Sequence, residues 1–175
     1  LVGLCIHDKS RRDLERAEFR LKNAATSVGR ACSVLADACS EGLFGTKDFV
    51  AARSYFLLGA KKGNRVCWQE LAEYLHAGIG GERDDAEAYY WISLEARCVA
   101  PNSIRGKETW KLREEIAQDL SLTELEKQWR RIDEYIQLVR SKKIAVDSPA
   151  FLEGEVKKEI SDEGAKLADK LEKEH

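Results

Sequence analysis

The fold is decided by residues 52–91, ARSYFLLGAKKGNRVCWQELAEYLHAGIGGERDDAEAYYW, whose pattern recurs when the chain is compared with itself. At an offset of 36 residues, an aromatic residue, several alanines, two glycines and an aspartate coincide. The coincident sets are Phe19, Tyr55 and Trp91; Ala24, Ala60 and Ala96; Leu35 and Leu71; Ala36 and Ala72; Gly42 and Gly78; Gly45 and Gly81; Asp48 and Asp84; and Ala52 and Ala88. A repeat of this length is typical of solenoids, in which each unit buries its apolar face against the next.

Each unit is predicted to contain two short helices. In the second unit, Ala52, Tyr55 and Ala60 lie on one face of the first helix. Gly63 and Asn64 then interrupt the apolar pattern and predict a turn. The alanines allow neighbouring helices to approach closely, and the aromatic residues at the position of Tyr55 are expected to pack between them.

The second helix of this unit carries Cys67, Leu71 and Leu75 at intervals of four, again on one face. It is predicted to end at Gly78, because glycine readily adopts the left-handed conformation that closes a helix. Asp84 begins a capping pattern for the first helix of the third unit, expected over 84–97.

The C-terminal third departs from the repeat. A helix over about 104–118 is expected to be a degenerate partner helix, because it lacks the leucine, alanine and glycine pattern. Ser121 and Glu124 form a capping-box pattern, which predicts a closing helix over about 122–141. Ser148 and Pro149 indicate another helix start. Residues 149–160 are expected to dock on the solenoid. Contact with a partner and fraying stay open as alternatives for the acidic tail.

The pattern of residues 52–91 resembles the Sel-one-like repeat (SLR) family, a relative of the tetratricopeptide repeats with a longer, glycine-rich turn. The resemblance covers residues 16–97, with Arg16 departing from the small residue expected before Phe19. It implies an all-α fold, a short α-solenoid of antiparallel helix pairs with extra C-terminal capping helices. The expected organisation is an N-terminal extension and helix start over 1–15, repeats over 16–118, and capping helices with a charged tail over 119–175.

Composition sets further limits. The 175 residues suit one domain, and 43% hydrophobic with 34% charged residues excludes a disordered chain. No apolar run is long enough to span a membrane. The net charge of −2 gives no reason to expect nucleic acid as a partner.

Because the chain starts at Leu1 and contains no Met, we expect a processed or trimmed form. Either an export signal was removed or the chain was shortened.

Five cysteines leave at least one thiol unpaired within a monomer. Cys32 and Cys39 are seven residues apart on one predicted helix, a rise of about 10.5 Å that exceeds the reach of a disulfide. No spacing of cysteine and histidine suits zinc. We therefore expect most cysteines to be small buried residues; the five are Cys5, Cys32, Cys39, Cys67 and Cys98.

No catalytic constellation is found. His7, His76 and His175 are scattered, and His76 is interpreted as a surface residue beside the turn at Gly78. The glycines at 78–81 lack the preceding strand and following lysine of a phosphate loop. The expectations are therefore that the protein is not an enzyme and has no catalytic residue, metal or cofactor.

Four residues are predicted to bind a partner: Arg53, Trp68, Tyr89 and Tyr90. The repeat does not require large side chains at these positions, and such side chains often anchor protein interfaces. The alternative is that they pack against a neighbouring helix or the C-terminal tail. Trp110 and Trp129, in the closing helices, are expected to lie in the core.

The function expected from this solenoid is a non-catalytic protein-interaction scaffold, and the resemblance implies roles such as adaptor, bacterial envelope regulator or immunity protein. The short stack favours a bacterial regulator or toxin-neutralising immunity protein with one dedicated protein partner, located in the periplasm or envelope, with the cytoplasm as the alternative. A competing hypothesis is an envelope enzyme or small-ligand-binding protein with a pocket between helices.

Overall fold

The computed structural model describes residues 2–141, with side chains from residue 11 onward, and within that range it contains helices and no strand. The helices are α1 (Val2–Ala25), α2 (Gly29–Glu41), α3 (Phe49–Lys61), α4 (Arg65–Ala77), α5 (Asp85–Ala96), α6 (Ile104–Gln118) and α7 (Leu122–Arg140). None of these helices is long and apolar enough to span a bilayer. The side chains of Cys5 and His7, and all residues after 141, lie outside the described part of the chain. The expectations for Cys5, His7, His175 and the tail therefore stay predictions.

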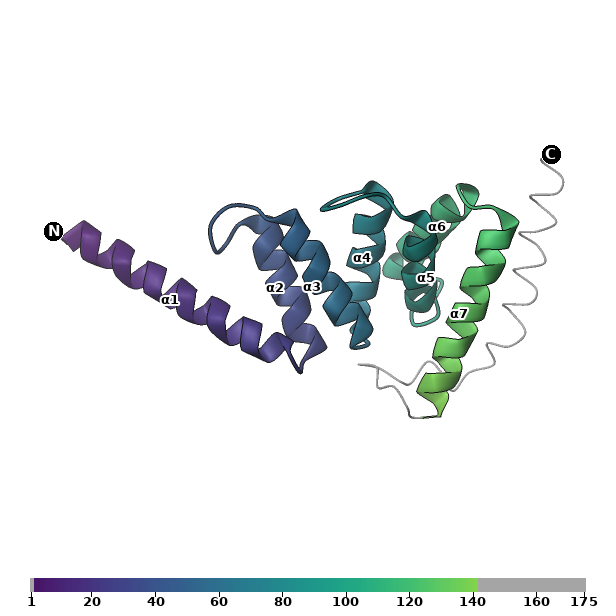
Figure 1. The fold of residues 1–175 in the computed structure, drawn as a ribbon, viewed down its shortest axis with the longest axis horizontal. Coiled ribbons are helices and arrows are strands. Elements are labelled where there is room, and N and C mark those ends of the chain that lie inside the picture. Colours follow the sequence, from purple (N-terminus) through teal and green to yellow (C-terminus); the bar gives the residue numbers. More distant parts are fainter. Residues whose placement is uncertain (1, 142–175) are drawn as a thin grey trace.

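The all-α solenoid is confirmed. Neighbouring helices pack in chain order from α1 to α6, so that the pairs form a row (Figure 1). The 36-residue period appears in the helix bounds: α2 and α4 differ by 36 at both ends, and α3 and α5 differ by 36 at their starts. The predicted helices over about 104–118 and 122–141 are confirmed to within one residue.

The helix ends follow the signals in the sequence. Asp48 and Asp84 occupy equivalent N-cap positions, and each accepts a hydrogen bond from the backbone N–H three residues later, at 2.9 Å. Gly42 and Gly78 close α2 and α4 with φ of 75° and 66°, a left-handed conformation that glycine adopts without strain. Ser121 and Glu124 form the complete capping box at the start of α7.

Small residues bring α2, α3 and α4 close together. A Cβ atom at Gly59 would lie 2.3 Å from the Sγ of Cys67 and 3.0 Å from the Cβ of Cys32, so no larger residue fits there. Cys32 and Cys67 are buried free thiols, as expected, while Cys39 and Cys98 are free and half-buried. Buried alanines line the same interior: Ala36, Ala52, Ala60, Ala72 and Ala88.

The third unit breaks the period because its helices are joined differently. The loop between α5 and α6 spans 97–103, whereas the equivalent turns span 26–28 and 62–64. The last helix, α7, packs back against α5 (Figure 1). It does so through an apolar stripe that includes Leu125, Ile132 and Ile136. This helix therefore covers the C-terminal end of the stack.

A buried carboxylate joins the last three repeat helices. Glu95 of α5 is fully buried, and Arg65 of α4 donates two hydrogen bonds to it, each at 3.1 Å. Arg105 of α6 lies 3.0 Å from one of the same carboxylate oxygens. A buried charge is tolerated only when it is paired, so this contact requires α4, α5 and α6 to keep their relative positions.

The burial of the aromatic residue differs from one repeat to the next. Trp91 is buried, with 5% of its surface exposed, and Tyr55 is half-buried, but Phe19 is 66% exposed. The prediction that Phe19 lies in the core is therefore wrong. Tyr55 of α3 packs against the hydrophobic core. No described helix covers the ring of Phe19 on α1.

The equivalent positions Trp91 and Phe19 therefore make a matched pair for stability measurements. Trp91→Ala should lower the free energy of unfolding by about 3–5 kcal/mol, because it removes a buried aromatic ring. Phe19→Ala should change it by less than about 0.5 kcal/mol, because the ring is already in water. Urea unfolding followed by circular dichroism measures both values. Equal losses for the two variants would contradict the different environments of the two rings.

Candidate functional site

Trp68 is part of the interior. It is fully buried, its Nε1 donates a hydrogen bond of 3.0 Å to the carbonyl oxygen of Ala60, and its ring meets Tyr135 of α7 edge-on at 6.0 Å. The prediction that Trp68 binds a partner at the surface is corrected, because α7 packs over it.

Tyr89 is also fully buried, and its hydroxyl serves an internal network. The Tyr89 oxygen accepts hydrogen bonds from Trp129 of α7 at 2.9 Å and from Arg113 of α6 at 3.0 Å. Arg113 donates as well to Ser93, at 3.1 Å. Tyr89 therefore connects α5 with both closing helices, and the prediction of a surface contact is wrong here too.

Tyr90 is 7% exposed, and the guanidinium of Arg131 lies 4.2 Å above its ring. Arg131 is held in this place by an ion pair of 2.8 Å with Glu87. Burial raises the pKa of Tyr90 to about 12, against the opposing effect of Arg131. The three predicted aromatic anchors are thus each covered by a side chain of α7.

Arg53 is the one predicted binding residue that stays partly accessible. Its Nη1 donates hydrogen bonds to the carbonyl oxygens of Glu82, at 2.8 Å, and Ile79, at 3.5 Å. The glycine-rich loop that it holds lies against the start of α3, where a Cβ atom at Gly80 would meet the carbonyl oxygen of Phe49 at 2.2 Å. Arg53 therefore positions this loop, and its contact with a partner stays a prediction.

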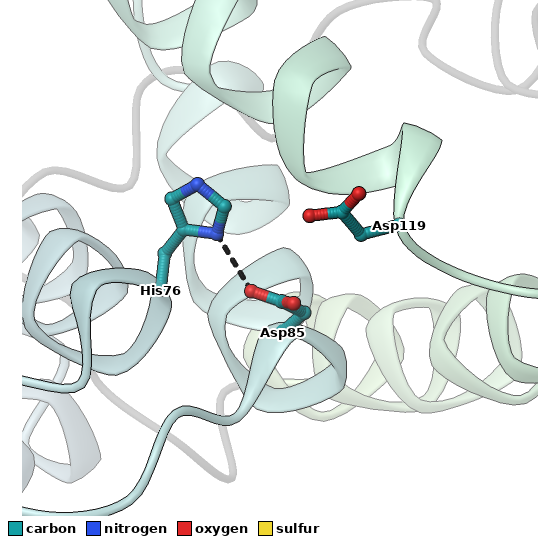
Figure 2. Close-up of side chains that lie close together, drawn as sticks. All are labelled: His76, Asp85 and Asp119. Carbon is teal, nitrogen blue, oxygen red and sulfur yellow. Dashed lines mark hydrogen bonds and ion pairs between the residues drawn. The ribbon is translucent and has the colours of Figure 1, made fainter.

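A cluster of charged residues lies beside the held loop. Figure 2 shows His76 of α4, Asp85 of α5 and Asp119, which follows α6, with the imidazole Nδ1 of His76 2.6 Å from a carboxylate oxygen of Asp85. Arg83 pairs with Asp85 at 2.8 Å and also with Asp119. His76 is consequently half-buried in an ion-pair network, rather than the plain surface residue that the sequence indicated.

The cluster has side chains of the types that hold metal ions. One ligand atom from each of His76, Asp85 and Asp119 lies within 4.8 Å of the others, a set that a divalent cation such as Zn²⁺ accepts. Among the described residues, no other such group of three occurs. However, the Arg83 guanidinium already contacts both carboxylates and supplies the positive charge that a metal ion would bring. The arrangement is explained as an ion-pair junction between the loop and the turn after α6.

The electrostatics of Asp85 follow from these contacts. Partial burial acts to raise the pKa of the Asp85 carboxyl, but hydrogen bonds from Arg83 and His76 outweigh it and lower that pKa below its ordinary value. The pKa of Arg83 is raised, through its hydrogen bond to Asp85 and despite some desolvation. The ionised forms of both partners are therefore favoured in the folded protein.

The exposed face of α1 that carries Phe19 is a candidate binding surface. Leu21 and Ala24 pack against the core. Phe19 precedes Leu21 by two residues, about 200° around the helix, so it lies on the opposite side of α1 from the core. Figure 1 shows α1 extending away from the other helices, with its outer side open. A shallow hollow runs along this face, lined by Arg12, Glu15, Arg16, Phe19 and Arg20.

The sequence did contain a signal for this face. Phe19 is the aromatic residue of the first unit that the repeat pattern identifies. Arg12, Arg16 and Arg20 recur every four residues, which places them on the same side of a helix. A second hollow lies along α7, beside Asp133, Glu134 and Leu138.

Comparison with known proteins identifies the fold. The structure is similar to a crystal structure of c5321, "a protective antigen present in uropathogenic Escherichia coli strains displaying an SLR fold", with a TM-score of 0.57 and 21% sequence identity. The match covers 81% of this chain and 29% of that chain, so this chain spans less than a third of its length. No protein-family model matches the sequence, and no curated protein matches it.

The junction at Asp85 predicts a pH-dependent contribution to stability. Since the folded-state pKa of Asp85 is lowered, this contribution is complete above the unfolded-state pKa of about 3.9 and disappears as the pH falls through the folded value. Asp85→Asn should therefore destabilise the protein by about 1 kcal/mol at pH 7, and the difference should shrink below about pH 4. Urea unfolding between pH 3 and 7 measures this, with the exposed Asp133→Asn as control. A loss that is the same at every pH would rule out ionised Asp85 as its source.

Proposed function

We propose that this protein is a non-catalytic scaffold that binds one protein partner through the exposed face of α1 that carries Phe19. The observation that carries the proposal is the exposure of Phe19, the aromatic side chain at the position where later repeats bury Trp91. An exposed large side chain at a packing position offers a partner the kind of contact that the equivalent aromatic residue makes within the stack.

The SLR fold supports this proposal in general terms, because stacked helix pairs build an extended surface whose variable positions can be adapted to a partner. Only one end of this stack is covered by a closing helix within the described residues, since α7 packs on α5. The three aromatic residues first expected to bind lie under side chains of α7, so the exposed face of α1 is the better candidate for the interface.

The finer assignment is a bacterial regulator or a toxin-neutralising immunity protein that acts by covering a surface of its partner. The small number of repeats supports a single dedicated partner rather than a large assembly platform. The similar solved protein is described as a protective antigen, which is a property of that longer chain.

The test is a binding measurement with matched variants. The full chain captures its partner from an extract of the native host, and the purified partner is then titrated against wild type, Phe19→Ala and Ile104→Ala. Ile104 is 80% exposed at the start of α6 and serves as the control for loss of an exposed apolar side chain. Phe19→Ala should raise the dissociation constant about thirtyfold, which corresponds to about 2 kcal/mol.

Ile104→Ala should bind as wild type does, and circular dichroism should show that both variants are folded. Wild-type affinity for Phe19→Ala would place the interface elsewhere, with Arg53 as the next residue to change. A host extract from which the full chain retains no protein would count against the scaffold function itself.

A further inference from the structure

The charged residues of the stack are divided between its two edges. Figure 1 shows the turns at 26–28 and 62–64 and the loop at 97–103 along the lower edge, and the loops at 42–48 and 78–84 along the upper edge. Residues 26–30, 61–66 and 98–107, here called the turn edge, contain basic residues and no acidic one: Arg30, Lys61, Lys62, Arg65, Arg105 and Lys107.

The upper edge has the opposite character. Residues 41–48, 78–85 and 119–121 carry mainly acidic side chains: Glu41, Asp48, Glu82, Asp84, Asp85 and Asp119, against Lys47 and Arg83. The net charge of −2 for the whole chain therefore conceals a separation of charge between the two edges.

Basic side chains join the three segments of the turn edge. The Nζ of Lys62 donates a hydrogen bond of 2.7 Å to the carbonyl oxygen of Thr26, and Arg65 donates one of 2.9 Å to the carbonyl oxygen of Cys98. Arg65 also pairs with the buried carboxylate of Glu95, which offsets part of the positive charge. The turn edge is therefore one continuous surface.

The basic residues of the turn edge do not serve the helices that begin there. Arg30, Arg65 and Arg105 lie in the first turns of α2, α4 and α6, none of which has an acidic residue. The N-terminal end of a helix carries a partial positive charge, so basic residues there oppose helix stability. Pairing with Glu95 accounts for Arg65 and Arg105. Three exposed residues of the turn edge make no ion pair within the described part of the chain: Arg30, Lys61 and Lys107.

Each segment of the turn edge also exposes an aliphatic side chain. Val28 is 50% exposed, Val66 42% and Ile104 80%. Side chains in the first turn of a helix lean towards its N-terminus, so Val66 and Ile104 lean towards the turn edge. Aliphatic side chains are thus interspersed with exposed basic ones along this edge.

We infer that the turn edge binds the surface of an anionic phospholipid membrane. The basic side chains meet the lipid phosphates, and Val28, Val66 and Ile104 enter the boundary between headgroups and acyl chains. Positive charge and apolar burial together are the two signals that attach a protein to such a surface. The acidic upper edge is repelled by the same surface, which orients the protein with the first turns of α2, α4 and α6 towards the bilayer.

Other occupants match the turn edge less well. An acidic protein segment is bound by basic groups that cluster, whereas these are spread over three successive turns. The acidic edge of a second copy is a poorer partner, because its carboxylates are already engaged. Asp48 and Asp84 cap helices, and Asp85 and Asp119 pair with Arg83. A membrane accommodates both the spread of the charge and the aliphatic side chains.

The experiment measures binding of the full chain to sedimented vesicles. Vesicles of phosphatidylcholine mixed with phosphatidylglycerol should retain the protein, and vesicles of phosphatidylcholine alone should not. Raised salt should weaken the binding, because exposed charges are screened. Circular dichroism confirms that each variant described below is folded.

The variant Arg30→Gln, Lys61→Gln, Lys107→Gln should bind the anionic vesicles at least about thirtyfold more weakly, because each basic residue near the surface contributes to binding. A matched variant removes the same charge from exposed residues elsewhere and should bind within about threefold of wild type. Its changes are Lys47→Gln, Lys111→Gln and Arg130→Gln.

The aliphatic contribution is tested separately. Ile104→Ser should weaken binding to the anionic vesicles about fivefold or more, because an aliphatic side chain no longer leaves water. Leu43→Ser is the control, since Leu43 is 54% exposed in a loop of the upper edge, and it should bind as wild type does.

Three results would overturn the inference. Equal binding to both kinds of vesicle, or binding to neither, would reject an anionic membrane. Equal losses in the two triple variants would assign the effect to net charge rather than to the turn edge. Tighter binding to soluble polyglutamate than to vesicles, lost in the first triple variant, would assign the edge to an acidic protein segment. The titration with the captured partner tests the face of α1, so the two outcomes are independent.

Discussion

The whole structure depends on one constraint: a pair of short amphipathic helices cannot bury its apolar face alone and must be covered by the next pair. Along the row this is achieved by close contacts at small residues, such as Gly59 against Cys32 and Cys67. The C-terminal end is covered when α7 packs back on α5. The aromatic packing position of the first unit is filled by Phe19, which is 66% exposed, whereas the equivalent Trp91 is buried.

Polar contacts hold the C-terminal half of the stack together. Glu95 holds two arginines from α4 and α6, and Asp85 and Arg83 join the glycine-rich loop to the turn after α6. Glu95 is fully buried, so separation of α4, α5 and α6 would leave a costly unpaired charge there. The pair between Arg83 and Asp119 is exposed and contributes less.

The fold could be predicted because its signals are local and repeated. Asp48, Asp84, Gly42 and Gly78 define helix ends through contacts within a few residues, and the period of 36 then places the helices in order. The site could not be predicted in the same way. Trp68, Tyr89 and Tyr90 become buried because α7 crosses them, and the packing of α7 follows no repeat. For Phe19, the repeat pattern specified the side chain but not whether a preceding helix would cover it.

The claim that the exposed face of α1 is the interface is tested most directly by hydrogen exchange of the full chain with and without its captured partner. The account predicts that backbone amides over residues 11–23 exchange more slowly in the complex, because the partner covers the outer face of α1. It predicts no change over α7, which is already packed on α5. Slower exchange confined to α7 or to the loop at 78–84, with α1 unchanged, would contradict the account.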